Sequence, residues 1–210
     1  DSEDAALIRR EQMRYVLTQL YLMMALNIVN AIFMATSLAD AVSPWLLGGW
    51  FTAIVLLSLV AVHARYRGRH RPLDRNTSKR SIRRLTVHSG IRGFIWGLAI
   101  ALFFADARAT EQLILASIAA GMLSGGTLAL AAIPSAALAY GGCMMIPSII
   151  RFAAMGTLEY FILAGFVLTF CGCLSLICAH FYRNFAGQLI ARQAATEQAA
   201  TISLLLNDYE

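Results

Sequence analysis

Six long apolar segments dominate this chain, and nearly all of its positive charge lies on one side of them. The segments cover residues 15–38, 45–63, 87–105, 112–133, 135–154 and 160–182. Because an α-helix rises about 1.5 Å per residue, each segment is long enough to cross roughly 30 Å of hydrocarbon. We therefore predict an all-α fold, a polytopic membrane protein with six transmembrane helices.

Composition and charge placement support this class and orient it. Charged residues make up 14% of the chain, against about 25% in soluble proteins, which leaves too little polar surface to coat a water-soluble globule. If the N-terminus is cytoplasmic, 15 of the 17 basic residues fall on the cytoplasmic side, and only Arg108 and Arg151 fall outside. The positive-inside rule then predicts that both termini are cytoplasmic.

The net charge of +5 does not indicate a nucleic-acid partner. The basic residues cluster beside the ends of the apolar segments, where they meet anionic lipid headgroups. The four cysteines, Cys143, Cys171, Cys173 and Cys178, all lie inside apolar segments, which argues against a disulfide framework. We expect the lipid bilayer as a partner and no nucleic acid.

Small residues and prolines predict how the helices pack. Gly93 with Gly97 and Gly121 with Gly125 form GxxxG pairs, which allow two helices to approach closely. Ala137 and Gly141 have the same spacing. The fourth segment, rich in glycine and alanine, is the candidate for the centre of the bundle. Pro134 predicts a tight turn before the fifth segment, and Pro147 predicts a kink within it.

The segments outside the spans are short. Residues 1–14 are mixed in charge and fit a short amphipathic helix at the inner surface, or else a frayed terminus. In the basic loop 64–86, Asn76, Thr77 or Ser78 could cap a helix that continues into the third span.

Uncharged polar side chains inside the spans are the candidate ligand contacts. Asn27 and Asn30 share one face of the first segment, and Ser124 and Thr127 lie in the fourth. They could line a pocket among the first, fourth and fifth spans, whose apolar walls would suit a hydrophobic or quinone-like ligand. The alternative is that they form hydrogen bonds between helices. The absence of a charged residue at mid-depth counts against transport driven by ions or protons.

Histidines and cysteines raise the alternative of a haem or metal site. His63, His88 and His180 fall at similar depth on three helices, and Cys171 and Cys173 lie close together in the sixth. Imidazoles also favour membrane interfaces, however, and free cysteine behaves as a small apolar residue. The sequence leaves the cofactor unknown.

The predicted outer face carries a few charges. Arg151 and Glu159 could pair to close a lid over a pocket between the fifth and sixth helices, or they could be solvated loop ends. No nucleophile, phosphate-binding loop or paired-carboxylate motif occurs, so we do not expect these residues to form an enzyme.

Residues 183–210 form a different kind of segment, with a repeat typical of a coiled coil. Its seam predicts pairing with a second copy to give a homodimer, whereas the alternative is a helix packed on its own bundle. The seam residues are Phe185, Gln188, Arg192, Ala195, Ala199, Ile202 and Leu206.

Six spans followed by a cytoplasmic helix resemble the MASE-like membrane sensor domains of bacterial signalling proteins. The stretch ARQAATEQAATISLLLNDYE at 191–210 is similar to linkers that lead into PAS, GGDEF or EAL modules or histidine kinases. The resemblance implies a sensor domain at 15–182 in the bacterial inner membrane and a signalling helix at 183–210. It also implies an effector after Glu210, either a cyclic-di-GMP enzyme or a kinase. Alternative hypotheses are a small transporter or channel subunit and a haem- or metal-binding membrane protein.

Overall fold

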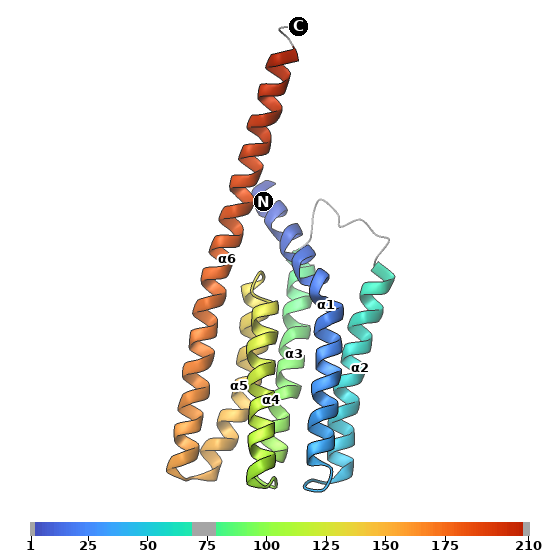
Figure 1. Cartoon of the computed structure of the whole chain (residues 1–210), viewed down its shortest axis with the longest axis vertical. Helices are drawn as coiled ribbons and strands as arrows, with labels where there is room; N and C mark the ends of the chain where they lie inside the picture. Colours follow the sequence, from blue (N-terminus) through green and yellow to red (C-terminus); the bar gives the residue numbers. More distant parts are fainter. Residues whose placement is uncertain (1–2, 69–78, 208–210) are drawn as a thin grey trace.

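The computed structural model describes residues 3–68 and 79–207, and these residues form helices joined by short turns. The helices are α1 (Glu3–Leu38), α2 (Pro44–Gly68), α3 (Lys79–Phe103), α4 (Ala109–Ala129), α5 (Pro134–Met155) and α6 (Leu158–Asn207). All six are long and apolar enough to cross a membrane (Figure 1). The predicted all-α membrane fold is confirmed.

Successive helices run up and down, so the connections alternate between the two ends of the bundle (Figure 1). One end, here called the basic end, carries the start of α1, the end of α2 with Arg65 and Arg67, and the start of α3. The α4–α5 turn lies at the same end, and the other three turns lie at the opposite end.

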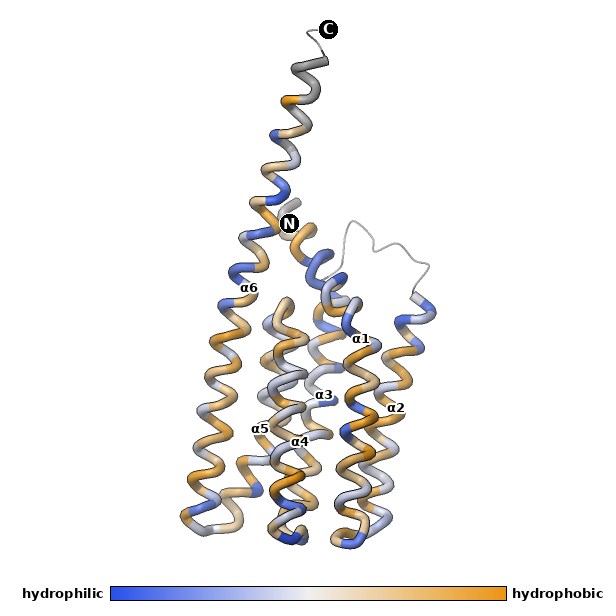
Figure 2. Tube along the Cα trace, in the orientation of Figure 1, coloured by the Kyte–Doolittle hydropathy of each residue, from blue (hydrophilic) through white to orange (hydrophobic). Residues whose placement is uncertain are grey.

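The outer surface of the bundle is apolar, as a lipid-facing surface must be. Trp45 is 90% exposed and Leu176 is 73% exposed. In Figure 2 hydrophobic residues predominate along the bundle, while hydrophilic residues gather at its ends and on part of α6 beyond it. In water such a surface would promote aggregation, whereas in a bilayer it is solvated by acyl chains.

The closest helix pair is α3 with α5. A side-chain carbon added at Gly93 would collide with the backbone of Tyr140, and one added at Gly97 would lie 3.0 Å from the carbonyl carbon of Met144. Glycine at these two positions therefore lets the backbones touch, as the GxxxG spacing predicts. Trp96 and Phe103, on the same helix, are fully buried.

The prediction that α4 is the centre of the bundle is wrong. The central helix is α3, which has the largest buried share of the six, followed by α5. Gly121 and Gly125 of α4 are exposed, and nothing lies within 4 Å of a side-chain carbon built at either position. Of the three glycines at 121, 125 and 126, Gly126 alone makes a close contact with another helix of the described chain, since the ring of Tyr140 lies against it. Glycine content indicates an ability to pack closely, but it does not tell which face finds a partner.

The turn between α4 and α5, residues 130–133, is as short as Pro134 predicts, and it is buried. The backbone N–H of Ile133 donates to the carbonyl of Leu130 at 2.8 Å, and the side-chain Nε2 of Gln12 on α1 donates to the carbonyl of Ala132 at 2.6 Å. The Gln12 amide satisfies a buried backbone acceptor that would otherwise destabilise the turn.

For the N-terminal segment the sequence suggested a separate surface helix or a frayed terminus, and from Glu3 onward the structure shows neither. This segment is the first part of α1, because no glycine or proline interrupts the chain between Glu3 and Leu38. Met13 and Val16 are buried in the protein. The predicted continuation of the basic segment into the third span is confirmed, since α3 begins at Lys79. The proposed capping residues Asn76, Thr77 and Ser78 lie outside the described residues.

Candidate functional site

The asparagines predicted to contact a ligand are engaged with neighbouring helices. The side-chain oxygen of Asn27, which is buried, accepts a hydrogen bond of 2.8 Å from Nε1 of Trp96 on α3. Asn30 donates to Sδ of Met122 on α4 at 3.2 Å. Both therefore join α1 to the rest of the bundle.

The two hydroxyl residues are bonded within their own helix. Ser124 donates to the carbonyl of Ala120 at 2.9 Å, and Thr127, which is buried, donates to the carbonyl of Leu123. The alternative of hydrogen bonds between helices therefore describes Asn27 and Asn30, whereas the hydroxyls of Ser124 and Thr127 bond within α4. The role of all four residues toward a ligand stays a prediction.

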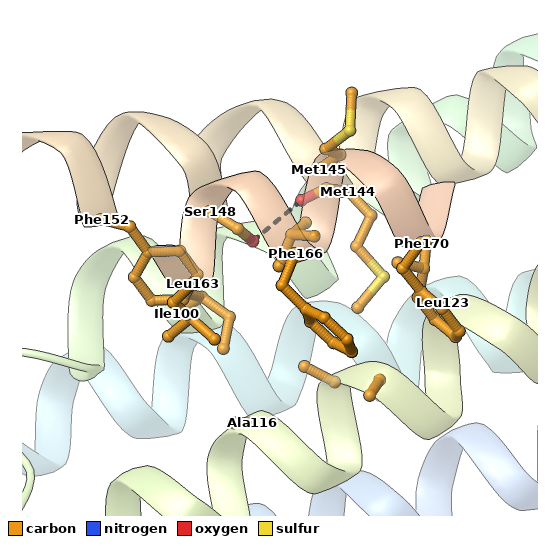
Figure 3. A pocket seen from close by; sticks show the side chains of 13 residues that line it. Ile100, Ala116, Leu123, Met144, Met145, Ser148, Phe152, Leu163, Phe166 and Phe170 are labelled. Atoms are coloured by element: carbon orange, nitrogen blue, oxygen red, sulfur yellow. Dashed lines mark hydrogen bonds between the residues drawn. The ribbon is translucent and has the colours of Figure 1, made fainter. Parts of the chain in front are cut away.

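The structure contains a cavity at another place, between α4, α5 and α6, with Ile100 of α3 also lining it (Figure 3). The cavity itself has a volume of about 100 Å³ and opens on one side, and together with the space in front of that opening it amounts to about 560 Å³. Apart from Ser148, its lining is apolar, and the Ser148 hydroxyl donates a hydrogen bond of 3.1 Å to the carbonyl of Met144. None of Asn27, Asn30, Ser124 and Thr127 is among the lining residues.

The course of α5 explains the cavity. Pro147 lies inside this helix and has no backbone N–H to donate to the carbonyl one turn earlier, which weakens the helix there. In Figure 1 the last part of α5 leans away from α4 toward the start of α6. The space that opens is lined by small side chains of α4, Ala116, Ala119 and Ala120, which do not fill it.

Aromatic residues form the α6 wall of the cavity and its end nearest the α5–α6 turn. Phe166 and Phe170 are one turn apart on α6, with ring centroids 6.1 Å apart and nearly parallel planes. Phe152 lies edge to face with Phe104 at 5.0 Å. These residues could not be selected from the sequence, because an aromatic residue in an apolar span gives no signal that separates a cavity wall from ordinary packing.

The charged cluster at the opposite end is only partly paired. Arg108 binds the carboxylate of Glu111 through its side chain and, at 2.9 Å, through its backbone N–H. This carboxylate raises the pKa of Arg108. Glu159 instead accepts a hydrogen bond of 2.6 Å from Thr157. Among the described residues no ion pair joins Arg151 to Glu159, so the suggested lid is wrong for this conformation.

Arg151 is the unusual member of this cluster. Its Nε atom is buried, and within residues 3–68 and 79–207 it has no hydrogen-bond partner. The side chain follows Ser148 by three positions and precedes Phe152, so it lies next to the cavity wall along α5.

The histidines do not come together. His63, His88 and His180 are all exposed, and His180 contacts Asn184 at 3.1 Å. In the described part of the chain no three histidine, cysteine or acidic side chains are grouped so that they could hold a metal ion. The haem or metal hypothesis gains no support from this arrangement.

The last helix carries the predicted seam out of the bundle. Helix α6 has 50 residues without a break, and its part 183–207, here called the exit helix, continues the sixth span (Figure 1). Gln188, Arg192, Ala195, Ala199 and Ile202 are exposed. Phe185 is half-buried on its own chain, and the side chain of Leu206 is outside the description.

The start of the exit helix is held by α1. The ring of Tyr15 lies 5.8 Å from that of Phe181 and 5.9 Å from that of Phe185, measured between centroids. With the hydrogen bond from Gln12 to the α4–α5 turn, this cluster connects three parts of the basic end. This cluster could not be identified from the sequence, because residues 11–16 resemble an ordinary boundary between a charged terminus and a span.

A scan against protein-family models, a search of the curated proteins and a search of the solved structures each found no match to this chain. Its fold therefore defines its class, which is an all-helical membrane protein with six helices able to span the bilayer in the described residues.

Proposed function

We propose that this chain is the transmembrane sensory input domain of a bacterial signalling protein in the inner membrane, with both termini in the cytoplasm. The observation that carries the proposal is the continuity of α6, which forms part of the bundle and then extends beyond it. At about 1.5 Å per residue, the exit helix reaches roughly 37 Å from the span. A shift or rotation of α6 inside the membrane is thereby transmitted to its far end.

The exit helix is built to pair with a second copy. Its exposed seam becomes more apolar with distance from the membrane, with Ala195, Ala199 and Ile202 after Gln188 and Arg192. An apolar stripe at spacings of three and four residues stabilises a two-stranded coiled coil when it is buried between chains. A stimulus acts in such a dimer only if it binds one arrangement of the helices better than another.

On this proposal the chain supplies input and pairing, and catalysis belongs to a separate cytoplasmic module. The resemblance of 191–210 to signalling linkers supports a cyclic-di-GMP enzyme or a kinase as that module. Charge placement supports the orientation, because the basic residues at the end of α2 and the start of α3 share one end with the exit helix.

Disulfide crosslinking in native membranes tests the dimer. In a chain whose four native cysteines are replaced by serine, single cysteines at Ala195, Ala199 and Ile202 should bridge two chains under mild oxidation. Ala194 and Ile190 are exposed positions away from the seam and serve as matched controls, which should bridge much less. A lack of bridging at all three seam positions, or equal bridging at seam and control positions, would reject a parallel paired exit helix and favour the transporter alternative.

A further inference from the structure

The cavity beside α5 extends along the helices rather than across them. In Figure 3 its lining runs from Phe152 and Leu163 at one end to Phe170 and Leu123 at the other. Along α5, Phe152 and Met144 are eight residues apart, which corresponds to about 12 Å parallel to the helix axis. The cavity therefore leads from near the end of the bundle toward mid-depth of the hydrocarbon, an orientation that suits a linear chain.

Arg151 lies on α5 between the lining residues Ser148 and Phe152, although it is not itself a lining residue. Arg151 is four residues before the end of α5, about 6 Å along the helix, so it lies near the headgroup level. Its buried Nε lacks a partner in the described residues. Two carboxylates at this end of the bundle have partners of their own, because Glu111 binds Arg108 and Glu159 accepts from Thr157. The Arg151 side chain as a whole is half-buried, and a guanidinium near the membrane boundary that lacks an anionic partner favours a ligand that brings one.

We propose that this cavity binds an anionic amphiphile, with its hydrocarbon chain between α4, α5 and α6 and its acidic head on Arg151. The apolar walls exclude a polar tail, since the one lining hydroxyl, on Ser148, already donates its hydrogen bond to the carbonyl of Met144. A guanidinium pairs with a carboxylate or a phosphate through two parallel hydrogen bonds. The shared chemistry is an acyl chain that ends in an anion, and its source is either a free fatty acid or an anionic phospholipid.

Such a ligand would act on the helix that leaves the bundle. Leu163, Phe166 and Phe170 of α6 line the cavity, and α6 continues without interruption to Asn207. Filling the space between α4 and α6 would favour the arrangement in which α6 stands further from α4. The role of the amphiphile as a stimulus rests on the proposed function, whereas its binding to the cavity does not depend on pairing of the exit helix.

Photolabelling of the whole chain in phosphatidylcholine nanodiscs tests the site. The probe is palmitic acid with a diazirine at mid-chain, mapped by peptide mass spectrometry. We expect labels concentrated on the cavity segments 144–152 and 163–170. Unlabelled palmitic acid should compete at least tenfold better than hexadecanol, which has the same chain without the charge. Arg151→Gln should remove that preference, and Arg151→Lys should keep most of it.

Matched variants separate the tail site from the head site. Ala116→Leu combined with Ala119→Leu fills the cavity and should lower labelling at least fivefold. Ser117→Leu, on an exposed face of the same helix, and Arg83→Gln, an exposed arginine near the basic end, should leave it unchanged. Thermal melting of each variant separates loss of binding from loss of fold.

The lipid composition identifies the source. If labelling by the fatty acid falls when the nanodiscs are made of phosphatidylglycerol instead of phosphatidylcholine, the occupant is an anionic phospholipid. If labelling is the same in both lipids, the occupant is the free acid. Labels spread evenly over lipid-facing residues such as Leu113 and Leu176, or equal competition by acid and alcohol, would overturn the site. Positive labelling without crosslinking of the exit helix would overturn the sensor proposal and leave the site in place.

Discussion

The ring of Tyr15, near the start of the bundle, lies edge to face with the ring of Phe185 on α6, their centroids 5.9 Å apart. The contact joins the first helix of the chain to the last one at the level where α6 leaves the other helices (Figure 1). Any movement of the exit helix relative to the bundle must work against it.

Tyr15→Ala should loosen the base of the exit helix. Edge-to-face aromatic pairs contribute about 0.5–1.5 kcal/mol each, so amide hydrogen exchange around residues 181–190 should become about two- to tenfold faster. Tyr21→Ala, an exposed tyrosine on the same helix, is the control and should leave exchange unchanged. Equal exchange in both variants would mean that α1 does not restrain the exit helix.

Gly93→Ala should destabilise the fold through the contact of α3 with α5. The added carbon meets the backbone of Tyr140, which has no flexible end to move aside, and overpacking of this kind costs about 1–3 kcal/mol. In Gly121→Ala the same change meets open space, where alanine favours a helix by up to about 1 kcal/mol. Thermal unfolding in detergent micelles should show a lower midpoint for the first variant only. A lower midpoint for Gly121→Ala in the native bilayer would instead indicate a partner on that face.

The hydrogen bond between Asn27 and Trp96 can be measured as a coupling energy. Asn27→Ala, Trp96→Phe and the double variant should give a coupling of about 1 kcal/mol in the free energy of unfolding, typical of polar contacts between transmembrane helices. Asn30→Ala paired with Trp96→Phe should be additive, because Asn30 binds Met122. Additivity in the first cycle would show that the bond contributes nothing measurable.

Cysteine labelling should reveal the orientation in the membrane. Single cysteines at Ala109 and Thr157, both exposed at the opposite end, should react with a membrane-impermeant maleimide on intact cells. A cysteine at Arg67, exposed at the basic end, should react only after permeabilisation. The reverse pattern would place both termini outside the cytoplasm and would remove the basis for a cytoplasmic exit helix.

Periodicity and length were enough to predict the six helices, because a span must satisfy its own backbone and needs about twenty apolar residues wherever it lies. For the same local reason the turn at Pro134 and the helical start of the third span could be predicted. The close approach at Gly93 and Gly97 followed from their spacing, yet an identical spacing at Gly121 and Gly125 has no partner in the chain.

The amino-acid sequence by itself determined the class of this protein: its helices, their order and the uneven distribution of charge around them. Only the tertiary structure decided which faces meet. It placed α3 at the centre, bonded Asn27 to Trp96, and left a cavity where α5 leans away from α4. Hydrophobicity cannot sort helices from one another inside a bilayer, since lipid tails are as apolar as leucine, so shape and hydrogen bonds between distant residues make that choice.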